Sequence, residues 1–166
     1  AEVERVIALV THHARSRPHE SLMVVTGNER HEVRVQQAVV QALGQPGAFT
    51  DFVVADSDEP FVVADVAHAN ALSRDRVIFS IGYARTRYGR AIDLGRLAAP
   101  GGDRMLAVAM TRARKAMTLV SGFQASDLDG QQLEHGAAVL RDALLEAERP
   151  HRPRSLRGGD PLLIDL

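Results

Sequence analysis

The stretch that most constrains the fold is residues 101–121, where a helical pattern passes directly into a strand pattern. Pro100 and two glycines interrupt the preceding segment. Apolar residues then recur at three- and four-residue spacing: Met105, Leu106, Ala109 and Met110. This spacing predicts a helix with one face toward a core. Residues 117–121 are short, apolar and β-prone, which predicts a buried strand. A helix followed at once by a buried strand is typical of an α/β domain.

The rest of the chain carries further segments of the same two kinds. Helical spacing predicts helices at about 2–13, 29–43 and within 131–148. Buried strands are predicted at 21–26, 59–65 and 76–81, and a short strand or extended loop at 52–55. We therefore expect a three-layer α/β fold with a mostly parallel sheet and helices on both faces. The junction at 101–121 is expected near an edge or end of that sheet.

The helix predicted at 29–43 begins after Asn28, a favourable N-cap residue, and ends before Gly44. Its expected inward residues are Val33, Ala38, Val39 and Leu43. With the strand before it, this helix forms one βα unit.

Length and composition favour one cysteine-free domain. With 166 residues, one domain is the expectation, spanning 1–148 with its core at 21–148. The Pro-, Arg- and Gly-rich residues 149–166 are expected to be a linker or tail leading to a downstream domain. The absence of cysteine excludes disulfides and thiolate zinc sites, and the histidines lack ligand spacing, so no metal site is predicted. No apolar run is long enough to span a membrane, so a cytoplasmic location is the default expectation.

Three cations follow the predicted helix closely: Arg112, Arg114 and Lys115. One interpretation is that they only cap the helix dipole and keep its end soluble. Lys115 is the single lysine of the chain and lies between Arg114 and Ala116. A P-loop needs a lysine between glycine and Ser or Thr, so this sequence contains no Walker A motif.

The string L-A-V-A-M-T-R-A-R at 106–114 resembles motif VI of superfamily 1 helicases. The resemblance covers about 21–148 and is strongest at 74–121. By it the chain is identified as the second, C-terminal RecA-like domain (motifs IV to VI) of a bacterial helicase of the Upf-like branch. The resemblance implies a P-loop NTPase type of fold without its own P-loop. ATP with Mg²⁺ would be bound mainly by the N-terminal RecA-like domain of the same polypeptide.

The same resemblance assigns roles to single residues. Arg112 would be the catalytic arginine finger, and we expect its side chain to project over the carboxyl edge of the sheet toward an interdomain cleft. Arg114 is expected to orient the junction or to pair with an acidic residue. Gly102 belongs to a G-G-D-R string like the one that precedes motif VI in the family, and it is a further nucleotide-facing candidate.

The loop before the strand predicted at 76–81 resembles motif V, in which Q-G-x-E-x-D precedes an apolar strand. Asn70 stands where Gln is common, Ala71 where Gly is, and Ser73 where Glu is, while Asp75 is kept. The resemblance implies a nucleotide-facing position for Asn70 and Ser73, although the lost glycine and glutamate weaken the match. The alternative is an ordinary loop between two core strands.

Residues 85–115 carry eight basic residues and two acidic ones. The candidate nucleic-acid contacts in and beside this segment are Tyr83, Arg85, Arg87 and Arg90. Such a segment could follow phosphates and stack a base of single-stranded DNA or RNA. The alternative is that an arginine-rich composition simply scatters cations over the surface.

The sequence thus predicts the second motor domain of an ATP-dependent DNA or RNA helicase, inactive without its partner domain and without a membrane association. The alternative is a noncatalytic α/β interaction or regulatory domain with degenerate helicase motifs. That alternative predicts that the cations around Arg112 are paired internally and face no open cleft.

Overall fold

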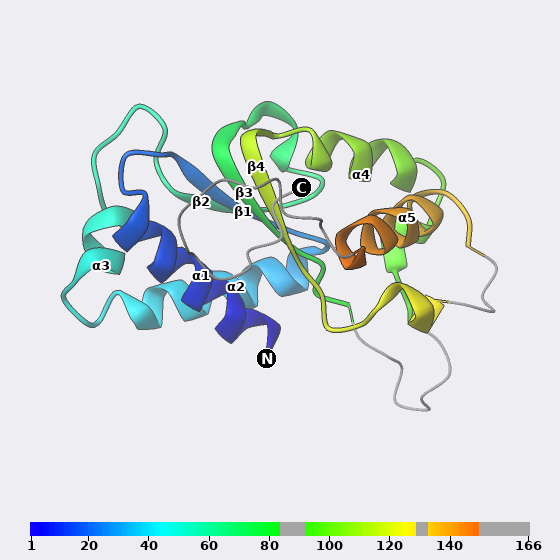
Figure 1. Cartoon of the computed structure of the whole chain (residues 1–166), viewed down its shortest axis with the longest axis horizontal. Coiled ribbons are helices and arrows are strands. Elements are labelled where there is room, and N and C mark those ends of the chain that lie inside the picture. The colour runs from blue at the N-terminus through cyan, green and yellow to red at the C-terminus, as the bar shows by residue number, and fades with distance from the viewer. Residues whose placement is uncertain (84–91, 129–132, 150–166) are drawn as a thin grey trace.

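A sheet of four parallel strands forms the centre of the structure, a computed structural model that describes residues 1–83, 92–128 and 133–149. The strands are β1 (Leu22–Thr26), β2 (Val62–Asp65), β3 (Arg74–Ser80) and β4 (Ala113–Val120). Their order in the sheet is β2-β1-β3-β4, and every neighbouring pair is parallel (Figure 1). The chain therefore crosses β1 on its way from β2 to β3, and β4 lies at one edge.

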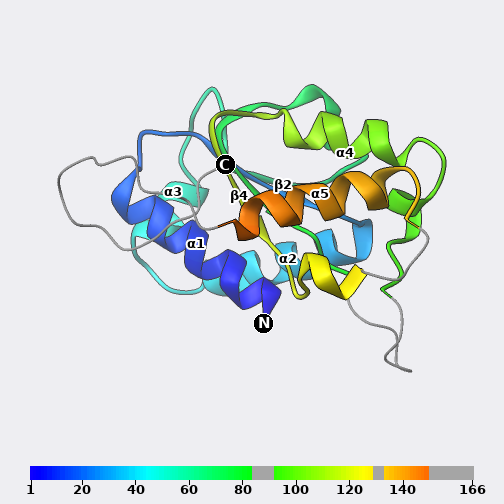
Figure 2. The ribbon, with the colours of Figure 1, turned by 45° about the vertical axis from the view of Figure 1, so that its right-hand side comes forward.

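Helices cover both faces of this sheet (Figures 1 and 2). One layer contains α1 (Glu2–Ser16), α2 (Glu29–Ala42) and α3 (Ala48–Val53), and the other contains α4 (Gly102–Met110) and α5 (Gly136–Glu148). Short 3₁₀ helices η1, η2 and η3 span Ala69–Ala71, Gly95–Ala98 and Ala125–Leu128. The predicted three-layer α/β architecture is confirmed and is consistent with a RecA-like fold.

Side chains along each strand alternate between the two faces of the sheet and so contribute to two hydrophobic cores. In β1, Met23 and Val25 contribute to the cluster that includes α4 and α5, while Leu22 and Val24 contribute to the cluster under α1 and α2. Because both faces of a parallel sheet are covered, these strands are apolar at nearly every position rather than at every second one. All five residues of β1 are buried.

The helix α2 begins as predicted, with the Asn28 side chain accepting a hydrogen bond of 2.9 Å from the His31 backbone N–H. Its inward face differs from the prediction. Val39 is buried as expected, but Val33 is 46% exposed, and His31 and Val35 take the inward positions instead. The buried set keeps a spacing of four, and Val33 lies outside that stripe.

Other boundaries also differ. The first half of the strand or loop expected at 52–55 belongs instead to α3, the helix that places Phe49 in the core. The strand β4 starts four residues before its predicted start, because Ala113 pairs with Arg74 at the beginning of β3. The last helix, predicted within 131–148, is present there as Gly136–Glu148.

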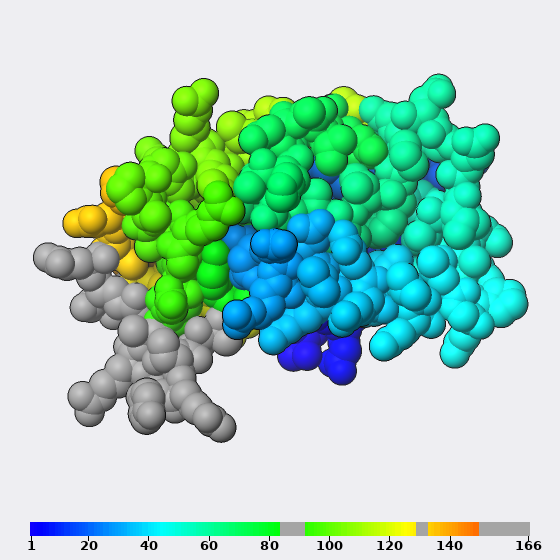
Figure 3. Space-filling view, turned by 180° about the vertical axis from the view of Figure 1, so that it is seen from behind, coloured from blue at the N-terminus to red at the C-terminus, as the bar shows by residue number. Residues whose placement is uncertain are grey.

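The chain segment between β2 and β3 lies at the surface beside α4 (Figure 3). It carries η1, which packs against α4. This packing brings the two stretches that resemble motifs V and VI together on one side of the sheet.

Candidate functional site

Arg112 lies between the end of α4 and the start of β4. Its backbone carbonyl accepts a hydrogen bond of 3.2 Å from the Arg74 N–H at the first residue of β3. Both strands begin here, so Arg112 lies at the amino edge of the sheet. The expectation that it projects over the carboxyl edge is wrong, because a helix that returns the chain to a parallel strand must end beside the start of that strand.

Neutral acceptors hold the half-buried Arg112 side chain. Its Nε donates to the Val108 carbonyl at 3.0 Å, its Nη1 to the Asn70 carbonyl at 3.0 Å and its Nη2 to Thr111 Oγ1 at 3.2 Å. A guanidinium has five N–H groups, so two remain for a ligand. Within the described part of the chain, no carboxylate forms an ion pair with Arg112.

A hollow of about 600 Å³ opens beside this arginine. Its described lining residues come from the segment after β2 and from α4: Ala67, Asn70, Gly101, Arg104, Met105, Val108 and Arg112. We call it the α4 hollow.

Arg114, two residues further on, is in the opposite electrostatic situation. Its Nη1 donates to Glu59 Oε1 at 2.6 Å, and its Nη2 donates to Asp75 Oδ1 at 3.1 Å. The hydrogen bond from Arg114 lowers the pKa of Glu59 to about 2. Burial alone would raise the pKa of Asp75, but hydrogen bonds from Lys115 and Arg114 outweigh it and lower that pKa. The expectation that Arg114 pairs with an acidic residue is confirmed.

The other nucleotide-facing candidates separate in space. Asn70 lines the α4 hollow and holds Arg112 through its carbonyl. Ser73 is exposed, and its hydroxyl accepts a 3.4 Å contact from Arg114 rather than from Arg112. Gly102 is buried and does not line the hollow; an added Cβ would lie 2.1 Å from the Leu97 carbonyl oxygen. The close approach of backbone therefore accounts for glycine at 102.

One nucleic-acid candidate, Tyr83, lies just beyond the end of β3, at the opposite, carboxyl edge. The half-buried Tyr83 donates from its hydroxyl to the Gly27 carbonyl at 2.9 Å and lines a hollow of about 460 Å³. Burial raises the pKa of Tyr83. The other three candidates, Arg85, Arg87 and Arg90, lie outside the described residues.

Sequence reasoning missed two arginines of this second hollow. Arg30 and Arg34 of α2 line it, and their four-residue spacing on a predicted helix was the available signal. Three acids also line it, namely Glu29, Asp65 and Asp93.

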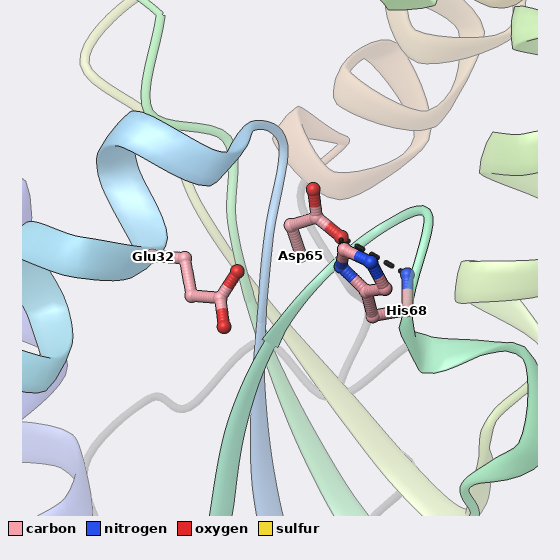
Figure 4. A group of neighbouring side chains, drawn as sticks. All are labelled: Glu32, Asp65 and His68. Atoms are coloured by element: carbon pink, nitrogen blue, oxygen red, sulfur yellow. Dashed lines mark hydrogen bonds and ion pairs between the residues drawn. The ribbon is translucent and has the colours of Figure 1, made fainter.

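One group of potential metal ligands lies nearby at the end of β2 (Figure 4). Glu32, Asp65 and His68 each offer an atom within 4.8 Å of the others. Asp65 Oδ1 accepts the backbone N–H groups of Ala67 and His68 at 3.0 and 2.9 Å and lies 2.7 Å from His68 Nδ1. Burial, followed by the charge of Asp65, raises the pKa of Glu32. Because Asp65 already closes the turn after β2, its position has a structural explanation, and the absence of a metal site stays a prediction.

No model of a known protein family matches the chain, and no curated protein matches it. Among the described residues, no helix is long and apolar enough to cross a membrane.

Proposed function

We propose that this domain is the second RecA-like motor domain of a superfamily 1 DNA or RNA helicase and supplies its arginine finger. ATP with Mg²⁺ would be bound mainly by an N-terminal RecA-like domain of the same polypeptide, and the motor would act on single-stranded nucleic acid. The observation that carries the proposal is the contrast between two arginines. Arg114 is paired with carboxylates, whereas the contacts of Arg112 among the described residues are with neutral acceptors, and Arg112 lines an open hollow.

The contacts of Arg112 suit a residue that must engage a phosphate. No carboxylate in the described ranges neutralises its charge, and exchanging carbonyl acceptors for phosphate oxygens strengthens its hydrogen bonds. The planar, permanently charged fork can then stabilise negative charge that develops on the transferring phosphoryl group. The missing Walker A lysine means that the chain alone would not hydrolyse ATP.

Asn70 would act as a positioning residue. Its carbonyl fixes one Nη of Arg112, so the loop that resembles motif V determines where the guanidinium points. Ser73 would contribute only through Arg114, and Gly102 would contribute through packing. The surface around Tyr83 would provide part of the nucleic-acid track.

The test is ATP turnover by the protein that joins this chain to its partner domain. Arg112→Ala should reduce turnover by roughly 10³-fold, by comparison with other arginine fingers. Arg112→Lys should recover little activity, because an ammonium lacks the planar fork. Arg5→Ala, at an exposed arginine of α1, is the matched control and should keep full turnover.

Thermal midpoints of the same variants separate catalysis from folding. The half-buried Arg112 makes hydrogen bonds at the helix end, so we expect the thermal midpoint of Arg112→Ala to fall by only a few degrees. Normal turnover in Arg112→Ala would favour the alternative, a noncatalytic interaction domain in which this arginine only caps α4.

A further inference from the structure

The α4 hollow is lined by a second arginine, Arg104, to which the sequence analysis assigned no role. Arg104 lies in the first turn of α4 and shares one stripe of that helix with Val108, whereas Arg112 lies two residues beyond the last residue of the helix, Met110. From Arg104 to Met110 the helix rises about 9 Å along its axis, so the two arginines flank most of α4. Arg104 is exposed and, like Arg112, lines the hollow.

The charge of the hollow is one-sided. Its described lining includes two arginines and no acidic residue, although acidic and basic residues are nearly balanced in the chain as a whole, at 21 and 20. Asp103 adjoins Arg104 in sequence but does not line the hollow. In the described part of the chain, Arg104 forms no ion pair, whereas Arg114 and Lys115 are both paired with carboxylates.

The wall between the two arginines is apolar or uncharged. Met105 and Val108 lie between them on α4, and Ala67 and Asn70 face them from the segment after β2. A ligand seated here would meet a guanidinium at each end and apolar surface in the middle. That pattern fits a molecule with several phosphate charges and an uncharged, partly apolar remainder.

We propose that Arg104 is a second phosphate-binding residue of the α4 hollow, and that the hollow takes the polyphosphate of a nucleoside triphosphate between Arg104 and Arg112. This inference rests on the proposed function and extends it. The two unused N–H groups of Arg112 engage one phosphate, and Arg104 engages another. Met105 and Val108 contact the apolar surface of the nucleoside.

Binding to the 166-residue chain tests the inference without any catalytic step. Calorimetric titrations with ATP and with inorganic tripolyphosphate, at low salt, would compare the unmodified chain with Arg104→Ala, Arg112→Ala and the Arg5→Ala control. Loss of a charge-assisted hydrogen bond corresponds to about a tenfold weaker affinity. We expect that loss for both ligands in each hollow variant, and less than a twofold change in the control. Tripolyphosphate should bind more weakly than ATP, because it lacks the nucleoside.

We do not expect a loss of folding stability to affect the affinity measured for Arg104→Ala. The exposed Arg104 has no ion-pair partner in the described part of the chain, so Arg104→Ala should keep the thermal midpoint of the unmodified chain. Arg104→Lys should recover part of the affinity, because the positive charge is kept while the fork is lost.

Three results would overturn the inference. The first is ATP affinity in Arg104→Ala equal to that of the control. The second is no detectable binding of ATP or tripolyphosphate by the unmodified chain at millimolar ligand. The third is an Arg104→Ala effect on a single-stranded oligonucleotide but not on ATP, which would assign the arginine to a nucleic-acid backbone.

Failure of the proposed function has a different signature. If Arg112→Ala keeps normal turnover in the protein joined to its partner domain, yet both arginines are needed for ATP binding, the hollow is a nucleotide site without a catalytic finger. If turnover depends on Arg112 while Arg104→Ala binds ATP normally, only the further inference fails.

Discussion

Removing the carboxylate of Glu2 should destabilise the domain far more than removing that of its neighbour Glu4. Glu2 lies in the first turn of α1, and its carboxylate reaches the carboxyl end of β3. Glu2 Oε2 accepts from Ser80 Oγ at 3.0 Å and from the Gly82 backbone N–H at 2.9 Å. His31 Nε2 lies 2.8 Å from the same serine oxygen and 3.5 Å from Glu2 Oε2.

The direction of these hydrogen bonds follows from the donors available. Ser80 gives its only proton to Glu2, so its oxygen must accept from His31, which requires the Nε2–H tautomer. Burial lowers the pKa of His31, which keeps the ring neutral at pH 7. The ring, the hydroxyl and the carboxylate then form a directed chain that joins α2, β3 and α1.

The size of the expected loss of stability in Glu2→Ala follows from the two hydrogen bonds that the Glu2 carboxylate accepts. Hydrogen bonds to a charged group contribute about 1.5–3 kcal/mol each, and the low end of that range gives about 3 kcal/mol for Glu2→Ala. In a domain of this size, 1 kcal/mol shifts the midpoint by about 2–4 °C, so we expect a fall of about 6–12 °C. Ser80 is fully buried, so its hydroxyl has little access to replacement water.

Glu4→Ala is the matched control, because Glu4 lies in the same helical turn and its side chain is 88% exposed. Both variants lose a favourable charge near the helix N-terminus, so the difference between them isolates the buried contacts. The assay is thermal unfolding followed by circular dichroism at pH 7. Midpoints for Glu2→Ala and Glu4→Ala that agree within about 2 °C would refute the reasoning.

Three further predictions concern the amino edge, the α4 layer and the basic segment. The Glu59 carboxyl has its pKa lowered to about 2, so its pairing with Arg114 stabilises the fold fully above about pH 4.5 and loses that effect as the pH falls toward 2. The difference in thermal midpoint between the unmodified chain and Arg114→Ala should therefore be largest near pH 7 and shrink below pH 4.5; a constant difference would contradict the pairing. Gly102→Ala should lower the midpoint by roughly 6 °C or more, because the added Cβ meets the Leu97 carbonyl oxygen at 2.1 Å, whereas Gly101→Ala meets no neighbouring atom within 4 Å and tests only the strain of its positive φ. If the basic segment follows a nucleic-acid backbone, single-stranded oligonucleotide binding should weaken as salt rises, and that dependence should flatten in the triple alanine variant of the segment; an unchanged slope would place the contact elsewhere. The residues replaced in that variant are Arg85, Arg87 and Arg90.

Local pattern was sufficient to predict most of the elements. The apolar run at 21–26, the Asn28 cap and the helix-to-strand junction at 101–121 each depend on residues close together in the chain, and each is present in the structure. The three-layer α/β fold then follows, because parallel strands joined by helices need both faces covered.

The sequence pattern gave the wrong structure or burial for residues whose type suits more than one local environment. Phe52 fits a short strand by composition, yet it lies in α3, where its ring packs against the Phe61 ring at a centroid distance of 6.3 Å. Val33 is apolar but falls outside the buried stripe of α2, because the polar His31 occupies an inward position through its contact with Ser80. Burial of these positions depends on partners that lie far away in the sequence.

The sequence by itself determined the residue types at the candidate site, including the T-R-A-R string and the single lysine that excludes a Walker A motif. Only the tertiary structure decided which arginine is paired. Arg112 and Arg114 are chemically identical and two residues apart, and strand β4 begins between them. The return of the chain at the amino edge directs Arg114 toward Glu59 and Asp75 and leaves Arg112 beside a hollow whose described lining contains no acidic residue. Sequence cannot show this difference, because it arises from the order of strands in the sheet, which brings residues 38 to 55 positions apart into contact.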